Sequence, residues 1–329
     1  MTSVLTIFLG IGVVILIIIL FKKVILPQRA ANAATMQDQK KIYQVIRQAK
    51  AEIDKDPQNA EANYLLGKAL LADKREEQAY RAYRSASRLG IEGKNIPEIE
   101  FREALALLYS KFNEEEEALK EYVLLIKKNP RNPDYFYQCG KLFSSRGRID
   151  RAEQYLAKAV SINPKESRYH LELGMTYYQS KKLKEASSAL ENALKNNPNE
   201  ALALLYIGKI YKDQKEYNSA LPYLEKAAQD QEYKLRALVE LGACYMSLRM
   251  TNKAITELER AVNFIEKDSE PDSLYARYFL AMCHENTKDY AKAVSQWEKI
   301  YAVKKNFRDV GEKLTQYIEY RSSGVDNKK

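Results

Sequence analysis

Groups that could carry out catalysis or bind a metal are few in this sequence and lie far apart. The 329 residues include two histidines, His170 and His284, and three cysteines, Cys139, Cys244 and Cys283. Catalytic and metal sites need such groups in close patterns such as CxxC, HExxH or GxSxG. The sequence has none of these patterns and no glycine-rich phosphate loop. We therefore expect no enzyme, no metal site, no cofactor and no small-molecule substrate.

The elements that carry these residues repeat at a fixed spacing. Seven alanines follow one another after 39, 34, 34, 34, 34 and 39 residues: Ala79, Ala118, Ala152, Ala186, Ala220, Ala254 and Ala293. Twelve positions before each one stands a small residue: Gly67, Ala106, Gly140, Gly174, Gly208, Gly242 and Ala281. Four positions after each alanine stands a large apolar residue. These spacings place the apolar side chains on one face of each of two helices per unit.

This pattern resembles the tetratricopeptide repeat, whose 34-residue unit reads W-x2-L-G-x2-Y, then A-x3-F, then P. Pro130, Pro164 and Pro198 close units as the family pattern requires. The resemblance implies an all-α, right-handed superhelical solenoid of about seven helix-turn-helix repeats, because a single hairpin cannot cover its own apolar face. The family binds other proteins, as a peptide or helix in a concave groove formed by the first helices.

The repeat also bears on the adjacent pair Cys283 and His284, which would suit a nucleophile and its base. Cys244 takes the same place as Cys283 one unit earlier, and most other units have an apolar residue there. We interpret the cysteines as core residues and the histidines as packing residues.

The periodicity divides the chain into five parts. We expect a transmembrane anchor at 1–26, a juxtamembrane linker and N-terminal helix at 27–55, seven repeats at 56–306, a capping helix at 307–322 and a polar tail at 323–329. The linker itself should be short, at 29–35. Five extra residues follow the first and sixth units, within 90–99 and 267–272.

The anchor is predicted from residues 4–21, which are 18 residues without a charge. As a helix they would span about 27 Å, close to one hydrocarbon core. The cations Lys22, Lys23 and Arg29 follow, which favours a single-pass protein with its N-terminus outside and its repeats in the cytoplasm. A cleaved signal peptide with a small-x-small site at residues 31–33 is the alternative, although positive charge before the apolar run is missing.

The formal net charge of +9 is concentrated at the two ends of the chain. Residues 1–50 carry +6 and residues 303–329 carry +3, so that residues 51–302 are neutral. We therefore expect no basic stripe along the repeats and no nucleic-acid partner.

The fifth, ninth and twelfth positions of each unit should face the groove, because they point about 120° away from the packing stripe. Aromatic residues, methionines and lysines there suit an extended or helical acidic-apolar peptide. The alternative is that the same rings and methionines pack against neighbouring first helices. The predicted residues are Tyr64, Lys68, Tyr137, Lys141, Met175, Tyr178, Lys209, Lys212, Met246, Tyr278 and Met282.

These observations predict a non-catalytic, membrane-anchored scaffold or adaptor that binds partner proteins and recruits or assembles a complex at the membrane. The alternative is a structural component or assembly factor of a bacterial envelope machine, of the flagellar-motor collar or pilus type, with its repeats in the periplasm. That alternative rests on an analogy of architecture alone.

Overall fold

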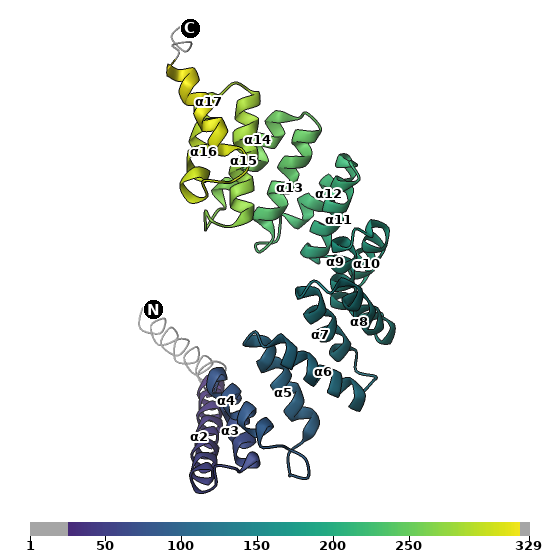
Figure 1. Ribbon diagram of the computed structural model, residues 1–329, viewed down its shortest axis with the longest axis vertical. Helices are drawn as coiled ribbons and strands as arrows, with labels where there is room; N and C mark the ends of the chain where they lie inside the picture. The colour runs from purple at the N-terminus through teal and green to yellow at the C-terminus, as the bar shows by residue number, and fades with distance from the viewer. Residues whose placement is uncertain (1–25, 323–329) are drawn as a thin grey trace, which may run out of the picture. The chain divides into compact units, whose positions relative to one another are not determined.

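The computed structural model describes residues 26–322, which form sixteen α-helices and no strand (Figure 1). Side chains are described from residue 38 to residue 317. The helices are α2 (Leu26–Lys55), α3 (Ala60–Ala72), α4 (Glu76–Arg88), α5 (Glu98–Lys111), α6 (Glu115–Lys128), α7 (Pro133–Ser145), α8 (Ile149–Ile162), α9 (Ser167–Gln179), α10 (Leu183–Asn196), α11 (Ala201–Asp213), α12 (Tyr217–Ala227), α13 (Lys234–Ser247), α14 (Thr251–Asn263), α15 (Pro271–Asn286), α16 (Tyr290–Val303) and α17 (Val310–Ser322). The predicted all-α repeat solenoid is confirmed.

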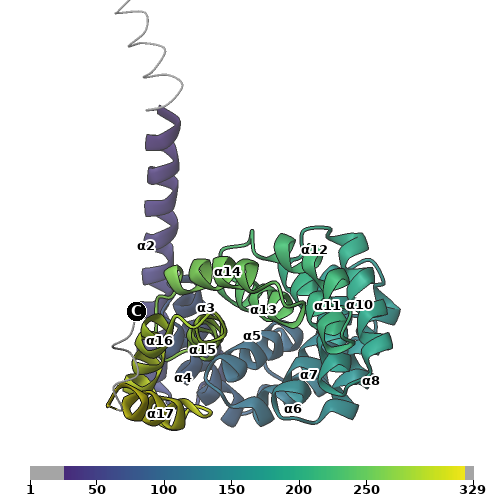
Figure 2. The same ribbon diagram turned by 90° about the horizontal axis from the view of Figure 1, so that it is seen from above.

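The chain forms two compact units, Met1–Pro130 and Arg131–Lys329, which we call the N-terminal unit and the C-terminal unit. The hairpins α3–α4 and α5–α6 belong to the first unit, and five hairpins from α7–α8 to α15–α16 belong to the second. In both views the two helices of a hairpin lie side by side (Figures 1 and 2). These seven hairpins coincide with the seven units of the sequence repeat.

The small residue of the repeat allows the two helices of a hairpin to approach closely. A Cβ atom added to Gly208 would lie 2.5 Å from Leu224 Cδ2, and one added to Gly140 would lie 2.5 Å from Leu156 Cγ. Both contacts are shorter than packed carbon atoms tolerate. The large apolar residue that the sequence places four positions after each alanine therefore occupies the space that the glycine leaves.

The turn between the two helices of each hairpin contains one residue with a positive φ angle. In chain order these residues are Lys74, Asn113, Gly147, Lys181, Lys215, Arg249 and Lys288. The next residue donates a backbone hydrogen bond to a carbonyl in the last turn of the first helix, for example from Glu216 to Tyr211 at 2.8 Å. This 6→1 bond is the Schellman arrangement, which satisfies carbonyls left free at a helix end.

The two predicted insertions lengthen different elements. The first gives a loop of nine residues, 89–97, between α4 and α5. The second falls at 264–270, and the following helix α15 has 16 residues against 13 to 14 for the other first helices. After the last hairpin, α17 covers the apolar end of the array: Val310 is fully buried, and the ring of Tyr317 stacks on Trp297 at 5.3 Å.

The N-terminal region differs from the prediction in one respect. Residues 29–35, expected to form a short link, belong to the 30-residue helix α2. Among the described residues, no helix is long and apolar enough to cross a membrane. The predicted anchor at residues 4–21 lies outside the described residues.

Candidate protein-binding surface

The residues predicted to bind partners lie on the first helices of the hairpins. In the N-terminal unit they are Tyr64 and Lys68 on α3. In the C-terminal unit they lie on α7 (Tyr137, Lys141), α9 (Met175, Tyr178), α11 (Lys209, Lys212), α13 (Met246) and α15 (Tyr278, Met282). We call the side of these five helices that carries these residues the first-helix face.

Burial separates the predicted residues into three groups. Tyr64 and Tyr278 are buried, with 3% and 7% of their surface exposed, and their rings pack against aromatic neighbours. Lys68 and Lys141 are exposed, and the remaining seven are half-buried. The half-buried tyrosines and methionines therefore present part of their apolar surface on the first-helix face.

The two lysines of α11 are already paired inside the protein. Lys212 forms an ion pair and a hydrogen bond with Glu240 of α13, and Lys209 Nζ lies 3.9 Å from Glu240 Oε1. Burial alone would lower the pKa of Lys212, but the carboxylate of Glu240 outweighs this effect and raises it. An acidic ligand would have to compete with Glu240 for both lysines.

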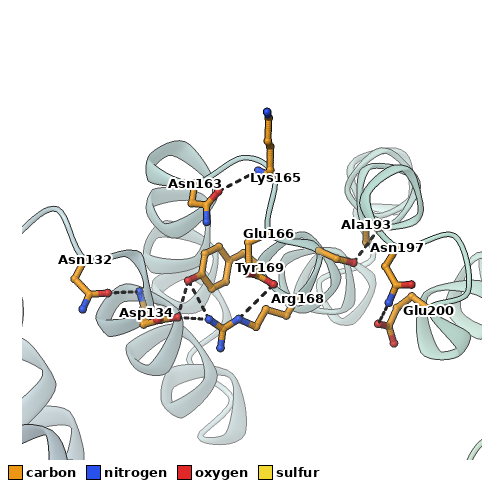
Figure 3. Close-up of polar contacts among 11 residues, drawn as sticks. Asn132, Asp134, Asn163, Lys165, Glu166, Arg168, Tyr169, Ala193, Asn197 and Glu200 are labelled. Carbon is orange, nitrogen blue, oxygen red and sulfur yellow. Dashed lines mark hydrogen bonds and ion pairs between the residues drawn. The ribbon is translucent and has the colours of Figure 1, made fainter.

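A second internal pairing connects α7 and α9 at their N-terminal ends (Figure 3). Arg168 Nη2 lies 2.6 Å from Asp134 Oδ1, and the hydroxyl of Tyr169 donates to the same oxygen at 2.6 Å. The Arg168 guanidinium also lies over the rings of Tyr137 and Tyr169, at 5.4 and 5.1 Å from their centroids. Burial and the bond to Asp134 both raise the pKa of Tyr169, so the phenol stays protonated as a donor.

Similar contacts join the later first helices. The hydroxyl of Tyr178 donates to Asp213 at 2.7 Å, and that of Tyr278 donates to Asp309 at 2.8 Å. Arg236 pairs with Asp272 at 2.9 Å. The contacts of Tyr178 and Arg236 link one repeat to the next, and the contact of Tyr278 links the last repeat to the segment before the capping helix α17.

Lys141 is the exception among the predicted lysines. Within residues 38–317 it makes no ion pair, and its ammonium lies 5.5 Å from the centroid of the Tyr137 ring. Burial raises the pKa of the nearby Glu172, and Lys141 partly offsets that rise. Lys141, Tyr137, Met175 and Tyr178 therefore form the part of the face that combines apolar surface with an available cation.

Several residues of this surface were missed by the sequence-based prediction, namely Asp134, Arg168, Asp213, Glu240 and Asp309. The first two occupy the second position of their units and Glu240 occupies the sixth. Both positions lie beside the predicted ones on a helix. A search for opposite charges at the same position of successive units could have found the Arg168–Asp134 pair.

The candidate catalytic and metal-binding groups occupy the core. Cys139, Cys244 and Cys283 are fully buried, and burial raises the pKa of the three thiols to about 12, 12 and 11. His170 Nε2 lies 2.8 Å from the carbonyl oxygen of Pro164. No group of three or more metal-ligating side chains occurs among the described residues.

A solenoid of stacked two-helix repeats is the class of protein that this fold defines. Two models of the tetratricopeptide repeat match the sequence, one at residues 144–206 and 211–278 and the other at residues 46–91 and 253–308. The matched residues make up well over half of the chain. The chain belongs to the tetratricopeptide repeat family.

Solved structures with a similar fold share little sequence with it. The Cut9–Hcn1 hetero-tetramer of APC/C contains a chain with 16% identity and a TM-score of 0.58, which covers 84% of this chain. This chain spans 52% of that one. A repeat protein from Parabacteroides merdae has 14% identity and a TM-score of 0.58, over 78% of this chain and 97% of the other. Pseudomonas aeruginosa pilF has 23% identity and a TM-score of 0.52, over 68% and 97%. No curated protein matches the sequence significantly.

Proposed function

We propose that the protein is a non-catalytic, membrane-anchored scaffold, in which a right-handed solenoid binds partner proteins and recruits or assembles a complex at the membrane. The observation that carries the proposal is the composition of the first-helix face. It combines half-buried tyrosines and methionines with charges that neighbouring repeats already neutralise. Such a face suits an extended or helical peptide held mainly by apolar contacts.

The apolar run at residues 4–21 and the cations that follow it support the membrane part of the proposal. The same cations favour repeats in the cytoplasm. The three cysteines are free and fully buried, which is compatible with a reducing compartment.

The binding face can be tested by site-specific photo-crosslinking of the full chain in its native membrane. A crosslinker replaces Lys141 on the first-helix face, and a matched one replaces the exposed Lys158 on the second helix of the same hairpin. We expect a defined protein adduct from position 141 that is absent from position 158. Equal adducts from both positions, or adducts from position 158 alone, would contradict a binding role for the first-helix face.

The sequence also supports a second candidate, an envelope-machine component whose repeats face the periplasm. Labelling of a Lys158→Cys variant with a membrane-impermeant thiol reagent on intact cells separates the two, because the native cysteines are buried. Cytoplasmic repeats should be labelled only after lysis, whereas labelling of intact cells would favour the periplasmic alternative. Release of the full chain from membranes by carbonate would contradict the anchor itself.

A further inference from the structure

The two edges of the C-terminal unit differ in charge. The turns inside its hairpins, at residues 146–148, 180–182, 214–216, 248–250 and 287–289, contain seven cations and two carboxylates. The loops between hairpins, at residues 163–166, 197–200, 228–233, 264–270 and 304–309, contain five cations and eight carboxylates. We call the first set the turn edge and the second the loop edge. The net charge is +5 on the turn edge and −3 on the loop edge.

This asymmetry corrects the expectation that the neutral body of the chain carries no basic stripe. The net charge of zero for residues 51–302 is correct. The fold nevertheless separates the charges of the C-terminal unit, because it brings the turns inside hairpins to one edge and the loops between hairpins to the other. The N-terminal unit shows no such sorting. Its two turns, 73–75 and 112–114, contain two cations and two carboxylates.

Most cations of the turn edge have no carboxylate partner. Lys182 pairs with Glu153 at 2.5 Å. In the described part of the chain no ion pair is made by Arg148, Lys181, Lys215, Arg249 or Lys288, all of which are exposed. Their charges are therefore available to an external anion, in contrast to those of Lys209 and Lys212.

A lysine or arginine at these positions destabilises the turn relative to glycine, because the backbone there is left-handed. Lys181, Lys215, Arg249 and Lys288 have φ angles of +59° to +65°. Glycine is the ordinary residue at such a helix end, since a side chain in the left-handed region costs roughly 1 kcal/mol. Only the turn at Gly147 uses glycine in this unit, and there the cations stand on both sides, as Arg146 and Arg148.

Contacts between hairpins place successive turns next to one another. Ser144 bonds to Gln179 at 3.3 Å, and Tyr178 bonds to Asp213 at 2.7 Å. These residues end α7, α9 and α11, directly before three of the turns. The cations of these three turns, Arg148, Lys181 and Lys215 among them, therefore lie next to one another rather than in separate sites.

One turn adds an apolar side chain to the turn edge. Met250 is 42% exposed and stands beside Arg249. Together with Lys253, whose ammonium lies over the Tyr245 ring at 5.6 Å, these residues line a shallow hollow. An exposed methionine between two cations suits a surface that combines anionic groups with an apolar interior.

We propose that the turn edge of the C-terminal unit binds the surface of a bilayer that contains anionic lipids. Unpaired cations gain free energy next to anionic headgroups, and Met250 can enter the acyl boundary. A nucleic acid would satisfy the cations but not the exposed methionine. The acidic loop edge would at the same time face away from the membrane.

The test uses the full chain in nanodiscs of phosphatidylcholine with increasing fractions of phosphatidylglycerol. An environment-sensitive fluorophore is attached at Asn252→Cys, in the first turn of α14 next to the turn edge, or, as a matched control, at Ser269→Cys on the loop edge. Both positions are exposed, and the native cysteines are buried. We expect a blue shift at position 252 that grows with phosphatidylglycerol and falls at high ionic strength, with no shift at position 269.

Charge variants test which cations are responsible. The set Arg148→Gln, Lys181→Gln, Arg249→Gln and Lys288→Gln should raise the phosphatidylglycerol fraction needed for half of the shift at least about threefold. The control set Lys165→Gln, Lys267→Gln, Lys304→Gln and Lys305→Gln removes the same charge from the loop edge and should leave it unchanged. Circular dichroism verifies that both sets keep their helices.

Three results would overturn the proposal: no lipid-dependent shift at position 252, an equal shift at 269, or a shift that survives the turn-edge set. A shift produced by RNA on pure phosphatidylcholine discs would instead assign the edge to a nucleic acid. The membrane anchor is tested separately. If the full chain fails to associate with phosphatidylcholine but still responds to phosphatidylglycerol vesicles, the anchor is wrong and the turn edge is supported.

Discussion

The first-helix face and the turn edge of the C-terminal unit use the same cationic residue types in opposite ways. On the face, Lys209 and Lys212 lie against Glu240, and Arg168 lies against Asp134. On the edge, Lys215 and Arg249 have no ion-pair partner among residues 38–317. A lysine in a repeat protein is therefore evidence for a binding surface only if no carboxylate of the next repeat forms an ion pair with it.

The largest effect on stability should come from forcing α11 and α12 apart, because α11 carries the paired lysines Lys209 and Lys212 of the first-helix face. Replacing Gly208 by leucine places atoms where Leu224 packs, at 2.5 Å from the added Cβ. We expect a loss of about 3 kcal/mol, measured by hydrogen exchange of α11 and α12 amides. Gly311→Ala is the control, because its Cβ would lie 3.7 Å from Tyr301 and should be tolerated. Equal exchange in wild type and Gly208→Leu would contradict the close helix contact.

Glu240→Gln tests the pairing itself. It leaves the half-buried ammonium groups of Lys209 and Lys212 without a counter-charge, which should cost about 2 kcal/mol in the stability of α11 and α13. The triple variant Lys209→Met, Lys212→Met and Glu240→Leu should recover most of this loss. If the single variant exchanges its amides as slowly as wild type, the pair contributes nothing to the face.

His284 adds a pH-dependent effect close to the last turn of the edge. It is 4% exposed, and burial lowers its pKa below the ordinary value near 6.5. The neutral form is therefore favoured in the folded state, and the stability of α15 and α16 should fall as the pH drops below about 6.5. A His284→Gln variant should lose this pH dependence in urea unfolding followed by circular dichroism. An unchanged profile would assign the acid sensitivity to other groups.

Replacing a turn residue of positive φ by glycine should change the free energy of unfolding less than Glu240→Gln does, and it should stabilise the protein. Lys215 has a φ of +65°, and Lys215→Gly should stabilise the α11–α12 hairpin by roughly 0.5–1 kcal/mol. Gly147→Lys, at a φ of +68°, should destabilise α7–α8 by a similar amount. Thermal unfolding of both variants measures this. A loss of stability in Lys215→Gly would remove the argument that cations on the edge are kept at a cost.

The smallest effect on stability is expected from neutralising the edge. The four turn-edge substitutions to glutamine remove exposed, unpaired charges and should change the free energy of unfolding by less than about 0.5 kcal/mol. This measurement distinguishes the turn edge from the first-helix face, because Glu240→Gln on the face should lower the free energy of unfolding several times more. A large loss from the edge set would mean that these cations have structural partners.

The sequence predicted the hairpins because the spacing of Gly208, Ala220 and Leu224 specifies both helices and their contact. It placed the insertions at residues 90–99 and 267–272 for the same reason. It could not predict that Lys212 reaches Glu240, because a 28-residue separation becomes a contact only through the angle between successive hairpins. The sequence did not predict the positively charged turn edge for a related reason. The net charge of a segment does not show on which side of a repeat each charge lies.

The sequence predicted on which helices the residues of the candidate site lie, but not how deeply they are buried or which of them form ion pairs. The eleven residues do lie on first helices, but Tyr64 and Tyr278 turned out to be buried and three of the four lysines turned out to be paired. Helical periodicity gives the direction of a side chain. It does not give the depth to which the neighbouring helix covers it.

The nine-residue loop at 89–97 has a mechanical consequence for the N-terminal unit. Fully extended, such a segment spans roughly 30 Å. The loop is not free to extend, because Asn95 N–H donates to Glu61 of α3 at 2.8 Å and the ring of Phe101 in α5 packs on Tyr83 of α4, with 5.5 Å between the ring centroids. A pull along the chain would therefore have to separate the α3–α4 and α5–α6 hairpins before this segment could lengthen.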